Sequence, residues 1–120
     1  MKKDFLAVAN YSPEELNELL DLAVDLKTEY FKHGNQPLLK GKVLGMLFNK
    51  QSFRTRISLD MALLHLAGDA LLISPNEIGL GKRYSIADVS RVLSAYVQGI
   101  MARVFWHDDV VNSARYAVEL

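Results

Sequence analysis

The sequence contains no cysteine among its 120 residues. This excludes disulfide bonds, thiolate-ligated zinc sites and cysteine nucleophiles, and it is typical of a reducing compartment. Long apolar runs are also missing: none reaches the ~18 residues that a membrane-spanning helix needs. Lys plus Arg equals Asp plus Glu at 14 each, so no net basic field favours nucleic acid or an anionic membrane surface. We therefore expect a cytoplasmic protein with no nucleic-acid or membrane partner.

Proline and glycine are few, at 3 and 7 residues. No Pro/Gly/Ser-rich linker, internal repeat or low-complexity tract divides the chain. Half of the residues are hydrophobic, which is enough for the core of one modestly stable domain. The sequence therefore predicts a single unit over residues 1–120.

Helical and strand patterns alternate along the chain. Ser12 is expected to cap a helix with Pro13 at its first position, Glu15 completing a capping box and Gly34 at its end. The other expected elements are strands at 42–48, 70–74 and 99–105, and helices from Ser52 to Gly68, after a second capping box at Ser85, and after Asp108 or Asp109. The order αβαβαβα predicts an α/β fold with three αβα layers and a parallel sheet connected by right-handed crossovers.

The apolar positions of the helices suggest which faces are buried. In the first helix, Leu16, Leu19, Leu20 and Ala23 recur at helical spacing. The stripes expected to face the core are Ile57, Met61 and Leu64 in the second helix, and Ile86, Val89, Val92, Leu93 and Tyr96 in the third.

Basic residues follow each of the three expected strands. The segment SFRTR at 52–56 follows the first strand, Lys82 and Arg83 lie in the loop after the second, and Arg103 comes late in the third. In an open parallel sheet, ligands bind beyond the carboxyl ends of the strands. These side chains are therefore expected near one edge.

The segment after the first strand has the chemistry of an anion site. A helix N-terminus leaves backbone N–H groups unpaired and carries partial positive charge. Ser52 and Thr55 add hydroxyl donors, and the guanidinium of Arg54 can make two parallel bonds to phosphate oxygens. The helix dipole alone contributes only ~0.3–1 kcal/mol. Arginine must therefore supply most of the binding.

Simpler roles stay open for the same residues. Ser52 can act as a helix cap without any ligand, and Lys82 and Arg83 can be solvated loop charges. Arg54 and Arg56 are two positions apart and point to different sides of a helix, and Arg56 can pair with Asp60 one turn along. No His, Asp and Glu cluster has metal-ligand spacing, and no Ser/His/Asp set is persuasive.

Two blocks of the sequence resemble a known family. FNKQSFRTRISLDMAL is similar to the Ser-x-Arg-Thr-Arg carbamoyl-phosphate signature of the aspartate/ornithine carbamoyltransferases. EIGLGKRYSIADVSRVLSAYVQGIMARVF resembles the ornithine branch in particular, and the resemblance extends over essentially the whole chain. The resemblance implies transfer of a carbamoyl group from carbamoyl phosphate to an amine. The likeness to the ornithine branch implies that this amine is the side-chain nitrogen of ornithine. It also implies a homo-oligomer, a trimer in the family, and no metal or organic cofactor.

The resemblance assigns roles to individual residues. Ser52, Arg54 and Thr55 would hold the phosphate, helped by the backbone N–H of Phe53. Arg103 would reach both the phosphate and the carbamoyl oxygen, which makes Arg103 and Arg54 the candidate catalytic residues.

Other residues match supporting positions of the family. Arg56, with Asp60, would be structural. Lys82 and Arg83 fall in a loop that can reach a neighbouring subunit's site across a trimer interface. Tyr84 stands where the family loop has glutamate, so a catalytic role for that loop is in doubt.

The sequence also departs from the family in other ways. Phe53 replaces a small or polar residue, and Leu59-Asp60 replaces Phe-Glu. Family members continue into a last strand, a His-Pro-x-Gln segment and a second, amino-acid-binding domain. We therefore expect residues 1–120 to be an incomplete carbamoyl-phosphate-binding domain, truncated before its last strand. Aspartate or another amino acid stays an alternative acceptor, and a non-catalytic folding unit or phosphate-binding fragment an alternative role.

Overall fold

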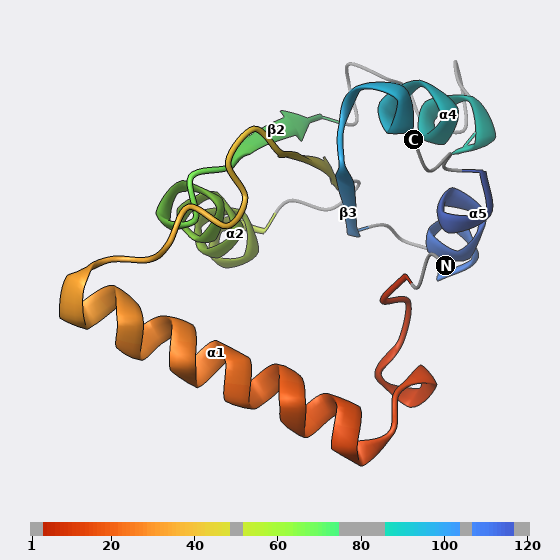
Figure 1. Ribbon diagram of the computed structural model, residues 1–120. Helices are drawn as coiled ribbons and strands as arrows, with labels where there is room; N and C mark the ends of the chain where they lie inside the picture. The colour runs from red at the N-terminus through yellow and green to blue at the C-terminus, as the bar shows by residue number, and fades with distance from the viewer. Residues whose placement is uncertain (1–3, 49–51, 75–85, 104–106, 117–120) are drawn as a thin grey trace.

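A computed structural model describes residues 4–48, 52–74, 86–103 and 107–116. Within them, helices and strands alternate as predicted (Figure 1). The elements are η1 (Val8–Asn10), α1 (Pro13–His33), β1 (Val43–Phe48), α2 (Phe53–His65), β2 (Asp69–Ile73), α4 (Ile86–Tyr96), β3 (Gly99–Arg103) and α5 (His107–Tyr116). Within the described residues, the expected strand and helix bounds differ from these by a few residues at most, and the end expected at 105 for the third strand lies outside those residues. The predicted α/β class is confirmed.

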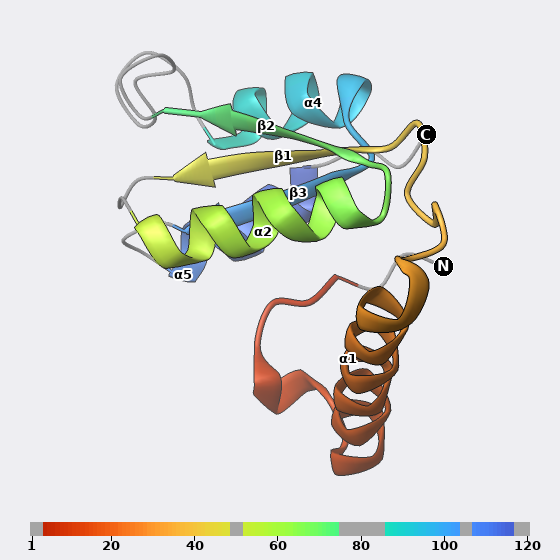
Figure 2. The same cartoon turned by 90° about the vertical axis from the view of Figure 1, so that its left-hand side faces the viewer.

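The described strands form one parallel sheet in the order β2-β1-β3. In register, Leu47 of β1 lies opposite Ile73 of β2 and Ala102 of β3. Helix α4 covers one face of the sheet and α2 the other (Figure 2). Parallel strands require such crossover helices, because a short hairpin cannot join them. The sheet therefore lies between helical layers, as the alternating sequence predicts.

The core lies between the sheet and α4. Leu47, Ile73 and Val89 form a buried cluster, and Leu93 and Ala102 pack against it. These side chains come from the three strands and from α4. They hold β1, which is central, in a fixed position relative to both neighbours, and so fix the edge at which the strands end.

Helix α1 begins and ends as its sequence predicts. Ser12 Oγ accepts a hydrogen bond from Glu15 N at 3.1 Å, and Glu15 Oε1 accepts one from Ser12 N at 3.0 Å. Gly34 follows the last residue with a φ of 83°, a conformation that glycine adopts without strain. The helix then projects away from the sheet rather than lying on it (Figures 1 and 2).

The stripe expected to face the core in α2 is wrong. Ile57, Met61 and Leu64 are exposed, whereas Leu63 is buried and Leu59 is half-buried. Both sets have helical spacing, so the periodicity offers two candidate faces. The position of β2, which α2 contacts, selects the second.

The expected inner face of α4 is only partly correct. Val89 is buried and Leu93 packs on the core, but Val92 and Tyr96 are exposed. The side chain of Ile86 lies outside the described part.

Two serines occupy part of that inner face instead. Ser90 and Ser94 of α4 are buried. Ser90 Oγ donates a hydrogen bond of 2.9 Å to Ser113 Oγ of α5. Burying a hydroxyl costs free energy when it has no hydrogen-bond partner, and this pairing removes most of that cost. Serine can therefore occupy a buried position for which the sequence pattern predicts an apolar residue.

Gly68, between α2 and β2, is closely packed against Leu63 and Leu39. A Cβ at this position would lie 2.8 Å from Leu63 Cδ1 and 3.1 Å from Leu39 Cβ. We expect Gly68→Ala to lower the free energy of unfolding by about 1–3 kcal/mol, because the buried Leu63 and its neighbours must move. Denaturant unfolding followed by circular dichroism measures the change.

Gly41→Ala is the comparison variant for this measurement. Nothing lies within 4 Å of a Cβ at Gly41, whose φ is +78°, so only backbone strain of about 1 kcal/mol is expected. A Gly68→Ala protein as stable as the unmodified chain would contradict the close packing.

Candidate functional site

The candidate site lies where β1 and β3 end and α2 begins. Phe48, the last residue of β1, is opposite Arg103, the last residue of β3. Helix α2 starts at Phe53 and is capped by Ser52. Arg103 is exposed, and its position at the strand end lets the guanidinium reach the start of α2 without being buried.

Thr55 is the centre of a hydrogen-bond network at this point. Its Oγ1 accepts from Ser52 Oγ at 2.9 Å and from Arg103 Nη1 at 3.3 Å. Its backbone N–H donates to Ser52 Oγ at 3.4 Å, as expected for a helix cap. A hydroxyl that accepts two bonds still has its own proton to donate. Three of the residues singled out in the sequence are therefore brought together from two elements.

Phe53 and Arg54 occupy the first turn of α2 and are exposed. The backbone N–H of Arg56 donates to Ser52 O at 3.0 Å and that of Thr55 to Ser52 Oγ. The N–H groups of Phe53 and Arg54 precede these and have no carbonyl acceptor within the helix. The hydrogen bonds that join Ser52, Thr55 and Arg103 do not include Arg54, which lies next to them in sequence.

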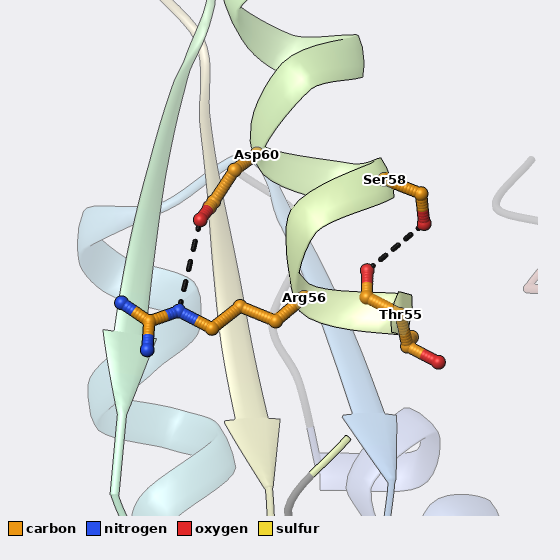
Figure 3. A network of polar contacts seen from close by, with 4 residues as sticks. All are labelled: Thr55, Arg56, Ser58 and Asp60. Carbon is orange, nitrogen blue, oxygen red and sulfur yellow. Dashed lines mark hydrogen bonds and ion pairs between the residues drawn. The ribbon is translucent and has the colours of Figure 1, made fainter. Parts of the chain in front are cut away.

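Ser58 contacts the site residue Thr55, and the sequence did not predict this contact. Its Oγ donates to Thr55 O at 3.0 Å, which ties the first turn of α2 to the second. The three-residue spacing between a serine and a site residue on a helix was the available signal. Figure 3 shows Thr55 and Ser58 on one side of the helix.

Arg56 and Asp60 lie on the other side of α2 (Figure 3). Arg56 Nε is 3.7 Å from Asp60 Oδ2, so the ion pair that the four-residue spacing allowed is present. The side chains are 54% and 41% exposed, which makes this a surface pair. The Arg56 side chain points away from Thr55, so Arg56 is separate from the hydrogen-bonded cluster of Ser52, Thr55 and Arg103.

We expect Arg56→Ala to lower the free energy of unfolding by less than ~1 kcal/mol, because exposed ion pairs are weak. Phosphate affinity should stay within about twofold if the arginine is only structural. Thermal unfolding and calorimetric titration on one preparation measure both quantities, with Asp60→Asn as the matched variant. An unchanged melting temperature with lost phosphate binding would make Arg56 a ligand.

Several residues singled out in the sequence lie outside the described parts of the chain. They are Lys82, Arg83, Tyr84 and the cap at Ser85. Among the side chains that the structure describes, which exclude those of residues 107–110, no three of His, Asp or Glu are grouped closely enough to bind a metal ion. No helix within residues 4–48, 52–74, 86–103 and 107–116 is both long and apolar enough to span a membrane.

Comparison with known proteins decides the family. The model of the aspartate/ornithine carbamoyltransferase carbamoyl-P binding domain matches residues 3–119. The chain belongs to this family.

Individual relatives of this carbamoyltransferase domain agree. The ornithine carbamoyltransferase of Thermus thermophilus is 44% identical over 117 residues, which are 98% of this chain and 38% of the relative. The crystal structure of ornithine carbamoyltransferase from Pyrococcus furiosus superposes with a TM-score of 0.92 at 42% identity, covering 96% and 37% of the two chains. The catalytic subunit of M. jannaschii aspartate transcarbamoylase gives a TM-score of 0.84 at 27% identity, with 92% and 37% covered. The chain thus spans less than two fifths of these proteins.

Proposed function

We propose that these residues form the carbamoyl-phosphate-binding part of an enzyme that transfers a carbamoyl group to the side-chain amine of ornithine. The observation that carries the proposal is the Arg103–Thr55 hydrogen bond at the N-terminus of α2. It joins a guanidinium to a hydroxyl in the first turn of a helix, where N–H groups lack a carbonyl acceptor within the helix, at the carboxyl edge of a parallel sheet. This is a favourable environment for a phosphate group.

In the proposed reaction, the phosphate of carbamoyl phosphate is held by Ser52, Thr55, Arg54 and the N–H of Phe53. The amine attacks the carbamoyl carbon, and negative charge develops on the carbonyl oxygen. In this proposal Arg103 stabilises that charge and also contacts the phosphate. As the C–N bond forms, the bond from carbon to the phosphate oxygen breaks, phosphate leaves with the electron pair, and the amine loses a proton. Fixed donors at such an oxygen are commonly the largest catalytic contribution.

These donors are all protein groups, so the proposal needs no metal or organic cofactor. The absence of cysteine is compatible with a reducing compartment, and we place the protein in the cytoplasm.

Binding is tested by titrating carbamoyl phosphate or inorganic phosphate into the chain in a calorimeter. We expect Arg103→Ala to weaken binding about tenfold or more, because a charge-assisted hydrogen bond contributes ~1.5–3 kcal/mol. Arg115→Ala removes an equal charge from the last turn of α5 and serves as the control. Equal affinities for the two variants would refute the site.

Ornithine is proposed as acceptor because the T. thermophilus relative named above is an ornithine carbamoyltransferase at 44% identity, against 27% for the aspartate transcarbamoylase subunit. A chimaera in which residues 3–119 replace the matching segment of the T. thermophilus enzyme tests whether the segment works with the amine-binding part of an ornithine enzyme, which is the part expected to select the acceptor. A second chimaera uses the M. jannaschii subunit. Citrulline formation by the first and no carbamoyl-aspartate formation by the second is the expected result. The reverse would favour aspartate.

We also propose that the chain self-associates through α2. Phe53, Ile57, Met61 and Leu64 form an exposed apolar row on this helix, and exposed rows of this kind favour association.

Sedimentation velocity at micromolar concentration should show a dimer, trimer or larger species. Met61→Ser should shift the distribution toward monomer, whereas Val92→Ser on α4 should not. A monomer at all concentrations would exclude the interface. Contacts of Lys82 and Arg83 across such an interface are part of the same proposal.

A further inference from the structure

Helix α5 is attached to the rest of the fold mainly through α4, its principal packing partner among the described elements. In Figure 1, α4 and α5 lie on one side of β3 and β2 lies on the other. Helix α5 begins at His107, four residues after Arg103, which is the last residue of β3. A link of this length spans at most ~3.6 Å per residue. The place of α5 on α4 therefore limits where the end of β3 can lie.

Two side-chain contacts join α5 to α4. Ser90 Oγ of α4 donates a hydrogen bond of 2.9 Å to Ser113 Oγ of α5, and the two serines are only 1% and 6% exposed. One turn further along α5, the ring of Tyr116 lies 5.0 Å from the guanidinium carbon of Arg91, which also pairs with Asp88 at 3.8 Å. The side chains of Arg91 and Asp88 are more than half exposed, and exposed cation–π contacts are weak. The serine pair is therefore the buried, directional contact of the two.

The bond between Ser90 and Ser113 fixes the register of α5 along α4. Burial of apolar surface is non-directional, so it changes little when one helix slides along another. A helix rises about 1.5 Å per residue, and a hydrogen bond between hydroxyls needs an O···O distance of about 2.5–3.0 Å. A slide of α5 by one residue would therefore separate the two buried hydroxyls, which costs free energy. Buried polar groups fix helix register in coiled coils for the same reason.

The contact of Arg103 with Thr55 is sensitive to a shift at the end of β3. Within the described strands, β3 pairs only with β1, and Arg103 lies opposite the last residue of that strand. Arg103 Nη1 is 3.3 Å from Thr55 Oγ1, already longer than the ~2.9–3.0 Å that is most common for N–H···O bonds. A displacement of about 0.5 Å away from α2 would take the two atoms out of hydrogen-bond range.

We propose that Ser113 is a positioning residue for Arg103. Through its hydrogen bond to Ser90 it fixes α5 on α4, and α5 in turn holds the end of β3 from which Arg103 reaches Thr55. The hydroxyl of Ser113 acts from between two helices, so its effect on the site is indirect. Its consequence for phosphate affinity rests on the function proposed above, whereas the position of Arg103 in the ligand-free chain does not.

The test introduces Ser113→Ala into the whole chain and follows the Arg103 guanidinium by heteronuclear NMR without ligand. The signal is assigned by its loss in Arg103→Lys. In Ser113→Ala we expect it to move toward the position of a solvated arginine. Inorganic phosphate, titrated calorimetrically, should bind about threefold or more weakly, because Arg103 is no longer held beside Thr55. An unchanged Arg103 signal would overturn the proposal. If the unmodified chain binds no phosphate, the proposed function fails, and the NMR comparison still decides whether Ser113 positions Arg103.

Ser12→Ala is the matched control, because it removes a serine hydroxyl that caps α1 and lowers stability away from α4 and α5. It should leave the Arg103 signal and the phosphate affinity unchanged. Ser90→Ala combined with Ser113→Ala separates positioning from stability. With neither hydroxyl left unpaired, this double variant should regain stability lost in Ser113→Ala but keep the displaced signal and the weaker phosphate binding. It also gives the decision if Ser113→Ala does not fold. A native Arg103 signal in the double variant would make the serine pair purely structural.

Discussion

Assayed alone, the 120-residue chain is expected to form citrulline at least five orders of magnitude more slowly than an ordinary enzyme. The described residues bring together the donors proposed for the phosphate, but a transferase must also hold the amine against the carbamoyl carbon. Positioning of two reactants supplies ~7–11 kcal/mol of barrier lowering. A loss of 7 kcal/mol corresponds to roughly a 10⁵-fold slower reaction.

The reason for this expectation is the length of the relatives. The chain spans 38% of the T. thermophilus ornithine carbamoyltransferase. We expect the groups that hold the amine to belong to the part of that protein with no counterpart in these 120 residues. Closure around the substrates would also exclude water and strengthen each donor bond.

The measurement is citrulline production with ornithine in excess, with the T. thermophilus enzyme as positive control. Turnover of about 1–10³ per second by the 120-residue chain would contradict the expectation. It would mean that these residues contain an amine site that the proposed mechanism does not use.

Replacing Arg54 with alanine is expected to abolish measurable phosphate binding while leaving the fold intact. Arg54 is the second residue of α2 and is exposed, next to the hydrogen-bonded cluster of Ser52, Thr55 and Arg103. A planar guanidinium makes two parallel bonds to phosphate, which contribute more than the helix dipole does. Because the side chain is exposed, little of the folding energy depends on it.

Arg54→Lys separates charge from geometry. Lysine keeps the charge but cannot make the two-bond contact, so its affinity should lie between those of the native chain and Arg54→Ala. Calorimetric titration at two salt concentrations measures all three proteins, and Arg115→Ala is again the control. Native-like affinity in Arg54→Ala would remove this arginine from the site.

The sequence predicted best where structure depends on neighbouring residues. The caps at Ser12 and Ser52 and the end of α1 at Gly34 follow from local hydrogen bonds and backbone freedom, and all three are present. The parallel sheet followed from the alternation of elements. The joining of Thr55 to Arg103 was expected only as a convergence at one edge, because the contact depends on the packing of α2 against the sheet.

The sequence predicted least where two faces of a helix are both apolar. In α2, Leu59 and Ile57 begin equally regular stripes, and only tertiary packing decides between them. In α1, a row with a clear helical period faces no part of the sheet. Periodicity reports that a helix has an apolar face, but it does not report what covers that face. The buried pair of Ser90 and Ser113 was not predicted, because each hydroxyl is satisfied by the other and the two lie 23 positions apart in the sequence.

The hydrogen bond between Arg103 and Thr55 connects residues 48 positions apart. These two groups come together only in the folded chain, so an anion that binds both has no equivalent site in the unfolded one. Such a ligand stabilises the native state by mass action, by about 2.7 kcal/mol at a concentration 100 times its Kd. With the proposed site, phosphate in a buffer acts as a folding ligand for this chain, and we expect melting temperatures measured in phosphate and in an uncharged buffer to describe two different equilibria.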